Sequence, residues 1–455
     1  MIIDRSFFSN AVSEVVFAGC EGATFEKFVI DSRKATTGST FIALKGERVD
    51  GHDFIHNALE HGATSFIINR DKMSCFDTIE KSLLKTLNIA LVSNVSGALI
   101  ALASAWREQF SCPIIGITGS VGKTSTKEML THIVRISGKK CLSSLGNYNT
   151  LLGISLTLLD LRQDHDCAII EMGINKRGEM AKMAALVRPT FAIITAIAHS
   201  HMEGLGSLND IAAEKRQIFS CFKENNIGII NGDQNILSSV SYPHPVVRFG
   251  CKTTNQIQAR KIQVHGFTTT FMLKIYHDRY VITLPTAHSS WIFNSLASAA
   301  AAYFLKIDAK HIIAGIQSAQ IVQGRFEFRR LPQYNSLLID DCYNANPESM
   351  KAALLAFENI ESSGKKIAIL GDMLELGVNA PFWHRQLGRF LKKTPSLDHV
   401  IFVGKYIKSA EKTIPRSLSF ASFDTWQDAL VALEKELNEH ATILIKASRG
   451  MEFNN

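Results

Sequence analysis

The stretch Gly116-Ile117-Thr118-Gly119-Ser120-Val121-Gly122-Lys123-Thr124-Ser125 joins an apolar run to an amphipathic helical pattern. Glycines at such a junction let backbone N–H groups approach phosphate oxygens, and the N-terminus of the following helix adds a favourable dipole. In a loop of this kind Lys123 is expected to reach the β- and γ-phosphates, and the Thr124 hydroxyl is expected to ligate Mg²⁺. We therefore predict a phosphate-binding loop between a strand at 113–118 and a helix near 123–136.

The loop departs from the general nucleotide-loop pattern at one position. That pattern places a glycine six residues before the lysine, where this chain has Ile117, and Gly119 stands four residues before it instead. The alternative is an ordinary glycine-rich turn, but Gly-Lys-Thr at a strand-to-helix junction seldom arises from packing alone. The loop indicates a nucleoside triphosphate and leaves hydrolysis, transfer and switching open.

Apolar runs alternate with helical patterns on both sides of this loop, which predicts an α/β fold with a mostly parallel sheet and helices on both faces. Residues 257–284 are β-branched and alternating, which suggests hairpins, and an alanine-rich helix follows at 290–305. The last third repeats the strand–helix alternation and predicts a Rossmann-like unit. Further strands are expected at 167–171, 191–197, 227–231, 337–340, 366–370, 399–403 and 442–446, and further helices near 178–187 and 207–223.

Residues 1–92 are predicted to form a small α/β domain around an amphipathic helix at 52–61, which ends at Gly62. Its short strands are expected at 28–30, 41–44 and 65–68. The chain has 455 residues, which at roughly 100–200 residues per domain suits three domains. We place them at 1–92, 93–318 and 319–455.

Composition excludes several classes of protein. Hydrophobic residues make up 46% and charged residues 20% of the chain, so it is neither disordered nor fibrous. The net charge of +7 is small for this length and does not choose between nucleic acid and small polyanions. No basic run is interleaved with aromatic residues, so we expect no nucleic-acid partner. The eight cysteines are scattered, and residues 1–10 do not resemble a signal peptide, so we expect a cytoplasmic protein.

Two uncharged stretches, 86–106 and 281–305, have the length of membrane spans. Polar residues such as Asn88, Asn94 and His288 interrupt them, and hydrocarbon penalises such groups. A buried strand followed by a buried helix is the better interpretation of both, so we expect no membrane span.

Three polar residues beyond the loop are candidates for metal chemistry. Glu171 ends the strand at 167–171, where a Mg²⁺ ligand belongs, although a strand-end residue facing solvent is the alternative. His201 follows the next strand in a glycine-punctuated loop, and His199 competes with it for the same role. Lys215 lies in the helix after that loop, and its sequence pattern alone favours a solvated surface charge.

Together these residues resemble the Mur ligase family, the ATP-dependent amide-forming enzymes of peptidoglycan synthesis. The phosphate loop, Glu-Met-Gly at 171–173 and His-Met-Glu-Gly-Leu-Gly at 201–206 resemble the family's central domain. Asp-Asp-Cys-Tyr-Asn-Ala-Asn-Pro at 340–347 and Gly-Asp-Met-Leu-Glu-Leu-Gly at 371–377 are similar to the branch that joins D-Ala-D-Ala to UDP-N-acetylmuramoyl-tripeptide (UDP-MurNAc-tripeptide). The similarity extends to 31–33 and 41–52 at the front of the chain.

The resemblance implies an ATP-dependent ligase that forms an acyl phosphate. It implies an N-terminal domain for the UDP-sugar, a central domain for ATP and a mobile C-terminal domain, and we expect a monomer. The residues that it implies for ATP are Gly119, Ser120, Val121, Gly122, Lys123, Thr124, Ser125, Asn294, Arg325 and Asp341. Those that it implies for the other substrates are Ser32, Arg33, Asn147, Asn149, Thr150, Tyr343 and Asn344.

The resemblance also implies two Mg²⁺ ions. Thr124 and Glu171 would hold one, and His201 the other, because the family's apolar-acidic-glycine pattern follows His201 rather than His199. It turns Lys215 into the lysine that family members carbamylate, which gives an anionic metal ligand. Lys123, His201 and Lys215 are thus the implied catalytic residues. Some positions depart from the residues usual in the family and bear on fine substrate contacts: Thr150, Ser155, Gln217, Thr286, Ala447 and Gly450.

Overall fold

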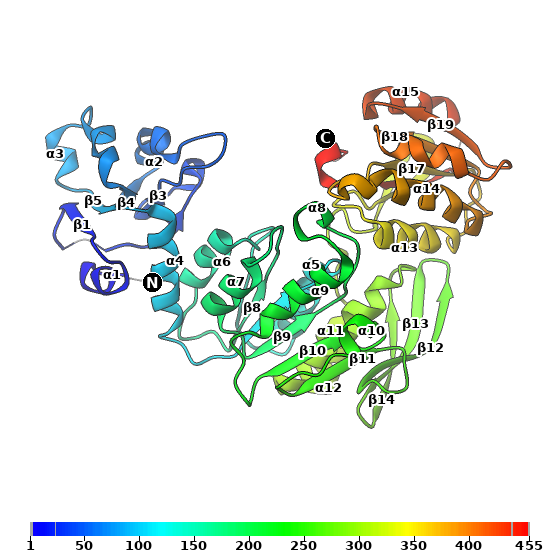
Figure 1. Ribbon diagram of the computed structural model, residues 1–455, viewed down its shortest axis with the longest axis horizontal. Helices are drawn as coiled ribbons and strands as arrows, with labels where there is room; N and C mark the ends of the chain where they lie inside the picture. Colours follow the sequence, from blue (N-terminus) through cyan, green and yellow to red (C-terminus); the bar gives the residue numbers. More distant parts are fainter. Residues whose placement is uncertain (1–2, 23, 438–439, 454–455) are drawn as a thin grey trace. The chain divides into compact units, whose positions relative to one another are not determined.

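The computed structural model describes residues 3–22, 24–437 and 440–453. The chain packs into two compact units, which are described separately (Figure 1). The first unit comprises residues 1–114, 140–172 and 182–188, and the second comprises 115–139, 173–181 and 189–455.

The first unit contains a five-stranded sheet in the order β1-β5-β4-β3-β2. Only β1 runs antiparallel to its neighbour. A second, parallel pair in this unit consists of β7 and β8. The strands are β1 (Val16–Gly19), β2 (Phe28–Val29), β3 (Ser39–Ile42), β4 (Ala63–Asn69), β5 (Asn88–Val92), β7 (Cys141–Ser143) and β8 (Cys167–Glu171). The helices are α1 (Arg5–Ala11), α2 (Ile55–Glu60), α3 (Lys81–Leu84), α4 (Val95–Arg107) and α6 (Leu151–Leu159).

The N-terminal helix predicted at 52–61 is present, but its first turn is a 3₁₀ helix, Gly51–Phe54, that leads into α2. The Asp50 side chain accepts a hydrogen bond from the His52 amide and so caps this turn. Gly62 follows the helix with φ at +100°, a conformation that L side chains rarely adopt, as expected of a helix stop. Strands and helix enclose one apolar core, which includes Phe41 and Phe66.

The second unit begins with seven strands in the order β14-β13-β12-β11-β10-β9-β6. Neighbours from β6 to β12 are parallel, whereas β12, β13 and β14 form antiparallel hairpins. The strands are β6 (Ile114–Thr118), β9 (Phe191–Ile194), β10 (Ile227–Asn231), β11 (Val246–Gly250), β12 (Ile257–His265), β13 (Thr268–Ile275) and β14 (Asp278–Leu284). Their helices are α5 (Lys123–Ile136), α8 (Met202–Leu205), α9 (Leu208–Arg216), α10 (Asn235–Ser238), α11 (Ser290–Phe304) and α12 (Ala309–Gln317). Helix α7 (Glu179–Val187) begins in this unit and ends in the first.

A six-stranded sheet in the order β15-β16-β20-β17-β18-β19 completes the second unit, and only β15 is antiparallel to its neighbour. In β17, Ile367 and Ile369 join one apolar cluster with α15, whereas Ala368 and Leu370 join another with α13 and α14. This alternation places helices on both faces (Figure 1). The elements are β15 (Glu327–Leu331), β16 (Ser336–Asp340), β17 (Lys366–Gly371), β18 (His399–Val403), β19 (Ser419–Phe423), β20 (Thr442–Lys446), α13 (Pro347–Glu358), α14 (Ala380–Phe390) and α15 (Trp426–Glu436).

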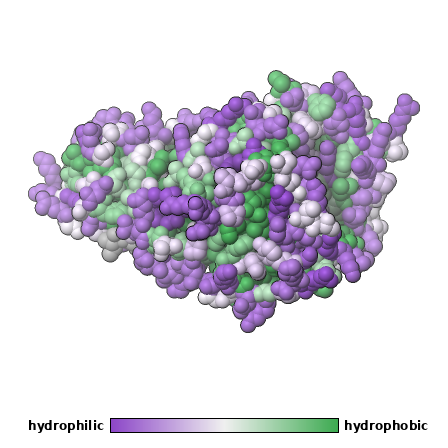
Figure 2. All heavy atoms as spheres, turned by 60° about the horizontal axis from the view of Figure 1, so that its bottom comes forward, coloured by the Kyte–Doolittle hydropathy of each residue, from purple (hydrophilic) through white to green (hydrophobic). Residues whose placement is uncertain are grey.

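The α/β fold class and the mostly parallel sheets are therefore confirmed. Both uncharged stretches are a strand followed by a helix, and no helix in the described ranges is long and apolar enough to cross a membrane. Hydrophilic residues dominate the outline of the face drawn in Figure 2. The predicted helix at 207–223 is wrong at its C-terminal end, because α9 stops at Arg216 and a 3₁₀ turn follows. The short or polar strands β7, β15 and β19 were not predicted from the sequence.

Candidate active site

The phosphate loop, residues 119–125, has a backbone that only glycine fits at two positions. Gly119 has φ at +151° and Gly122 has φ at +86°. A Cβ atom at Gly119 would lie 1.9 Å from Thr195 Oγ1, and one at Gly122 would lie 2.6 Å from Asn294 Oδ1. Helix α5 begins at Lys123, directly after the loop, so the positive end of its dipole faces the loop. The alternative of an ordinary turn does not explain this tight enclosure.

The segment that follows β9 holds the phosphate loop through backbone groups. The Ser120 amide donates to the Ala196 carbonyl at 2.7 Å, and the Ser120 hydroxyl donates to the Ala198 carbonyl at 3.0 Å. The Thr195 hydroxyl donates to the Val121 carbonyl at 2.6 Å. Gln234 fixes this segment in turn, because its side-chain amide exchanges two hydrogen bonds with the backbone of Ile197. The loop is therefore preorganised before any ligand arrives.

The two predicted cationic side chains, Lys123 and Arg325, lie beside the phosphate loop, where phosphate oxygens would bind. Lys123 Nζ donates to the Gly119 carbonyl at 2.9 Å, so its ammonium curls back over the loop. Arg325, from the segment before β15, donates through Nη2 to the Thr124 hydroxyl at 3.2 Å. The structure thus brings the predicted residue Arg325 to Lys123 and Thr124, which lie about 200 positions earlier in the sequence. Two positive charges beside the N-terminus of a helix make an anion site.

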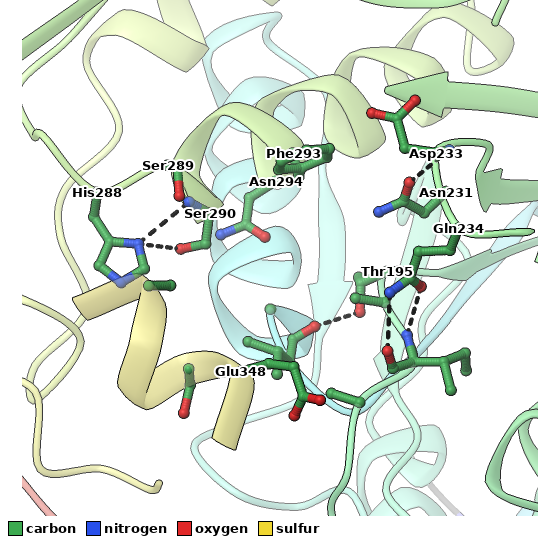
Figure 3. Close-up of a pocket in the computed structure, with 17 residues that line it drawn as sticks. Thr195, Asn231, Asp233, Gln234, His288, Ser289, Ser290, Phe293, Asn294 and Glu348 are labelled. Carbon is green, nitrogen blue, oxygen red and sulfur yellow. Dashed lines mark hydrogen bonds between the residues drawn. The ribbon is translucent and has the colours of Figure 1, made fainter. Parts of the chain in front are cut away.

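A cavity of about 290 Å³ opens beside the loop, and Figure 3 shows the side chains around it. Val121 and Gly122 form part of its wall, and Asn294 lies on α11 facing Gly122. Asn294 Oδ1 also accepts a hydrogen bond from the Thr126 hydroxyl at 3.3 Å. The predicted nucleotide residue Asn294 therefore lines a cavity that continues from the phosphate loop.

His288 also lines this cavity and is held in one tautomer. Its Nδ1 accepts from the Ser290 amide at 3.2 Å, and it lies 2.6 Å from the Ser290 hydroxyl. Burial lowers the pKa of His288 to about 4. The ring is therefore neutral near pH 7, with its proton on Nε2.

The two histidines after β9 have separate partners. His201 Nδ1 lies 2.5 Å from Glu375 Oε2. His199 Nδ1 lies 2.5 Å from Glu348 Oε1, and the His199 amide donates to Glu348 Oε2 at 3.1 Å. The hydrogen bond from His201 lowers the pKa of Glu375, an effect that outweighs desolvation. Each ring thus meets one carboxylate through Nδ1, and Nε2 of neither histidine makes a hydrogen bond with the described residues.

Lys215 is 1% exposed on α9, so its interpretation as a solvated surface charge is wrong. Burial lowers the pKa of Lys215 well below the usual range of lysine. The positive charge of Lys123 lowers this pKa further, while Glu214 acts in the opposite direction. Burial and the nearby charge of Lys123 therefore both favour the neutral amine of Lys215.

Glu171 lies at the end of β8 in the first unit and is 2% exposed, which excludes the solvent-facing alternative. Its Oε1 accepts from Asn149 Nδ2 at 2.9 Å, while its Oε2 is buried without a hydrogen-bond partner among the described residues. An unsatisfied buried carboxylate oxygen is costly unless a cation or a donor meets it. Glu171 thus fits a metal ligand.

The other predicted residues of the first unit are less constrained. Thr150 caps α6 by accepting from the Gly153 amide, and Asn147 is exposed next to it. Ser32 is buried in a short 3₁₀ helix. Arg33 is exposed and paired with Asp31, whose hydrogen bond raises the pKa of the guanidinium. Asn149 is the member of this set that reaches another predicted residue, Glu171.

In the C-terminal part, Asp341, Tyr343 and Asn344 form one loop after β16. The Tyr343 ring lies 3.8 Å from the Arg325 guanidinium carbon. Asp341 Oδ2 accepts from Lys446 Nζ at 2.6 Å. Sequence reasoning missed Lys446, as well as Glu348, Glu375 and Gln234. Glu375 lies inside the motif at 371–377 and could have been singled out. For Lys446, Glu348 and Gln234, no sequence pattern indicates the residue with which each pairs.

Three segments of the chain match known domains. Residues 25–107 match the Mur ligase family catalytic domain, 117–302 the Mur ligase middle domain, and 324–449 the Mur ligase glutamate ligase domain. The UDP-N-acetylmuramoyl-tripeptide–D-alanyl-D-alanine ligase of Escherichia coli (strain K12) is 34% identical over 447 residues, which cover 97% of this chain and 95% of that protein.

The chain belongs to the Mur ligase family. Two solved Mur ligases have similar structures. MurF from Acinetobacter baumannii gives a TM-score of 0.85 at 28% identity, with 100% of this chain and 97% of that one covered. MurF ligase from Thermotoga maritima in complex with ADP gives 0.79 at 27% identity, with 94% and 95% covered. The three-domain Mur ligase architecture expected from the sequence is thereby confirmed.

One departure from the usual Mur ligase pattern has a structural counterpart. Ala447 stands where glycine is usual, and its methyl group lies 2.6 Å from where a Cβ of Gly371 would be. Because Gly371 has no side chain, β17 and the segment after β20 still pack closely. The extra methyl group of Ala447 therefore fits after β20 because the neighbouring strand has a glycine opposite it.

Proposed function

We propose that this chain is the ATP-dependent ligase that joins D-Ala-D-Ala to the terminal peptide carboxylate of UDP-MurNAc-tripeptide. The observation that carries the proposal is the similarity, continuous over nearly the whole chain, to relatives named for this reaction. The product is a precursor of peptidoglycan, so the enzyme serves cell-wall synthesis and, through it, cell shape and division. We also propose a cytoplasmic location, because UDP-linked precursors and ATP are cytoplasmic metabolites.

The reaction has two steps. A carboxylate oxygen of the tripeptide attacks the γ-phosphorus of ATP, the bond from that phosphorus to the bridging oxygen breaks, and ADP leaves. The amine of D-Ala-D-Ala then attacks the acyl carbon and loses a proton. The tetrahedral intermediate expels phosphate as the carbon–oxygen bond to phosphate breaks. The first step joins two anions, so it needs concentrated positive charge.

Lys123 and Arg325 supply such charge at the phosphate loop. Lys123 lies over the loop carbonyls, and Arg325 contacts Thr124, so both can reach terminal phosphate oxygens. The loop amides and the α5 N-terminus bind the remaining phosphate charge. The cavity beside Gly122 would take the nucleoside, with Asn294 on its wall, and Asp341, whose charge acts on His288 of that wall, would lie near the ribose. Ser120, Val121 and Ser125 complete the loop.

Two Mg²⁺ ions complete the proposed site, and the side chains present fit them. The unsatisfied Oε2 of Glu171 would offer an oxygen ligand for Mg²⁺, and so would the Thr124 hydroxyl. His201 would ligate Mg²⁺ through Nε2, because its bond with Glu375 places the proton on Nδ1, as carboxylates bonded to the other ring nitrogen of metal-binding histidines do. When bound, these ions neutralise the phosphate oxygens and lower the repulsion felt by the attacking carboxylate.

Lys215 is proposed to carry a carbamate. A neutral amine reacts with carbon dioxide, whereas an ammonium does not, and the burial of Lys215 favours the neutral form. Carbamylation converts the amine into an anion, which suits a metal ligand and also offsets the charge of Lys123.

The remaining substrates are assigned by domain. We propose boundaries near residues 92 and 318; the second falls between the matched segments 117–302 and 324–449, whereas the first lies inside the matched segment 25–107. The UDP-sugar would contact Ser32 and Arg33, and the peptide would contact Asn147, Asn149 and Thr150. Tyr343 and Asn344 would lie near the reacting groups. Closure of the C-terminal domain in a monomer would align the substrates and exclude water.

The test is release of phosphate from ATP with UDP-MurNAc-tripeptide, measured with and without D-Ala-D-Ala. We expect release that depends on all three substrates and a product one dipeptide heavier by mass spectrometry. Equal turnover with single amino acids in place of the dipeptide would overturn the acceptor assignment. Release that is independent of any amine would overturn the ligase assignment.

A further inference from the structure

A charged side chain outside the proposed site lies at the carboxyl edge of the C-terminal sheet. Lys446 ends β20 and is 1% exposed, although lysine is almost never fully buried unless paired. Its Nζ donates to Asp341 Oδ2 at 2.6 Å, to the Asp341 carbonyl at 3.3 Å and to the Asn344 carbonyl at 3.0 Å. All three donors of the ammonium therefore hold one short loop, residues 341–344.

The sheet explains why this lysine reaches that loop. Strands β16 and β20 are parallel neighbours, with Asp340 opposite Ile445, so the chain leaves both strands at the same edge. The Asp341 amide donates to the Ile445 carbonyl at 2.9 Å. The next residue, Lys446, then spans the turn that the chain makes after β16. The position of the loop is thus set by a side chain from the end of the neighbouring strand.

The loop passes this constraint on to the phosphate loop. It carries Tyr343, whose ring lies 3.8 Å from the Arg325 guanidinium carbon. Arg325 in turn donates to the Thr124 hydroxyl at 3.2 Å. A continuous series of contacts therefore runs from Lys446 through Tyr343 and Arg325 to Thr124.

We propose that Lys446 is a positioning residue for nucleotide binding. It contacts none of the reacting atoms and acts by holding Asp341 and Asn344, on either side of Tyr343, whose ring packs on Arg325 beside the phosphate loop. The inference rests on the proposed function only in taking an adenine nucleotide as the ligand.

The chain contains a matched control at the opposite edge of the same sheet. Lys366 begins β17 and is also buried. Its Nζ donates to the Glu358 and Ile360 carbonyls and to the Ser396 hydroxyl at 2.8–3.0 Å. The two lysines thus have similar bonding, but only Lys446 holds a loop of the proposed site. Replacing each lysine by methionine removes one buried charge in both cases. A comparison of the two variants therefore separates an effect on nucleotide binding from a loss of stability.

The experiment titrates ADP with Mg²⁺ into the full chain by calorimetry, for wild type and for K446M, K366M, R325A and the double variant K446M/R325A. Thermal unfolding of each variant is recorded in parallel. We expect K446M to weaken ADP binding about tenfold or more, because truncating one member of a buried pair is costly. K366M should lower the melting temperature and leave ADP affinity within about twofold. The double variant should bind no more weakly than R325A, because both changes act through one series of contacts.

An unchanged ADP affinity in folded K446M, or additive losses in the double variant, would overturn the proposal. If K446M does not fold, K446R decides the matter. Its guanidinium keeps the charge but cannot place three donors on the same three oxygens. K446R is expected to weaken ADP binding, and wild-type affinity in K446R would overturn the proposal. Because ADP binding requires no acceptor, this result is independent of which amine the enzyme ligates.

Discussion

The phosphate loop at 119–125 and the loop at 341–344 belong to the same unit, and Arg325 touches both. The first is held through its backbone, with two glycines at positive φ and amides and carbonyls bonded to the segment after β9. The second has a few backbone hydrogen bonds, from the Asp341 amide to Ile445 and from the Tyr343 amide to Gly324, and is clamped by the buried ammonium of Lys446 from another strand. A loop held through its backbone is visible in the sequence as glycines. A loop held by a remote side chain has no such local sign.

The largest expected effect concerns Lys215, which lies close to the backbone-held loop. K215A should lower phosphate release more than about 100-fold, as removal of a group that stabilises transition-state charge does. Short carboxylic acids should restore part of the activity by supplying the missing anion. The measurement is the rate of phosphate release with and without added acetate.

The matched control is K223A, which removes an exposed lysine from the turn after α9 and should keep full activity. Full activity of K215A without any added acid would contradict the proposed carbamate. An inactive K215A that no acid restores would contradict it as well.

Gly119 tests the backbone-held loop directly. In G119A the new methyl group would meet the Thr195 hydroxyl, and the residue would have to keep φ at +151°. We expect phosphate release to fall about 100-fold, which corresponds to about 2.7 kcal/mol in the transition state. G138A is the control, because Gly138 also has a positive φ but has open space around it.

G138A should lose about 1 kcal/mol of stability from backbone strain and keep its activity. If G119A retained the wild-type rate of phosphate release, the close backbone fit at Gly119 would not be needed for activity. The proposed difference between the two loops would then be wrong.

Tyr343 tests the loop held by the side chain. Y343A removes the ring that stacks on Arg325, and a partly desolvated cation–π contact is worth about 1–2 kcal/mol. The KM for ATP should therefore rise about tenfold, as measured from initial rates at varied ATP. Y343F keeps the ring and should keep the KM. Equal KM values for Y343A and Y343F would show that the stacking does not position Arg325.

The smallest expected effect concerns Glu375 and its pH dependence. The hydrogen bond from His201 lowers the pKa of Glu375 below its usual value, so the ionised carboxylate stabilises the fold at neutral pH. This contribution is lost as pH falls through the lowered pKa. Because the side chain is half exposed, it should be worth less than about 1 kcal/mol.

The measurement compares the melting temperatures of wild type and E375Q from pH 3 to pH 7. Wild type should be the more stable protein at pH 7, and the two curves should converge towards acid. A difference that stays constant across this range would mean that the charge of Glu375 contributes nothing.

Much of the fold was predictable because the strands are short apolar runs between helical patterns. Helix α5 begins and ends where it was predicted, at Lys123 and Ile136. Strand β19 was missed because its residues are half exposed and polar ones alternate with aromatic ones. The candidate site was also predictable in part. The phosphate loop and Asn294 meet as expected, while the burial of Lys215 came as a correction.

The sequence by itself determined the phosphate loop, because glycine spacing and the lysine that follows act over a few neighbouring residues. It also determined the family, through motifs spread along the chain. Only the tertiary structure decided which charges are buried and with what they pair. Lys215 and Lys446 look like ordinary surface lysines in the sequence, and both are 1% exposed. Burial and pairing depend on the packing of segments far apart in the chain, and no local pattern records that packing.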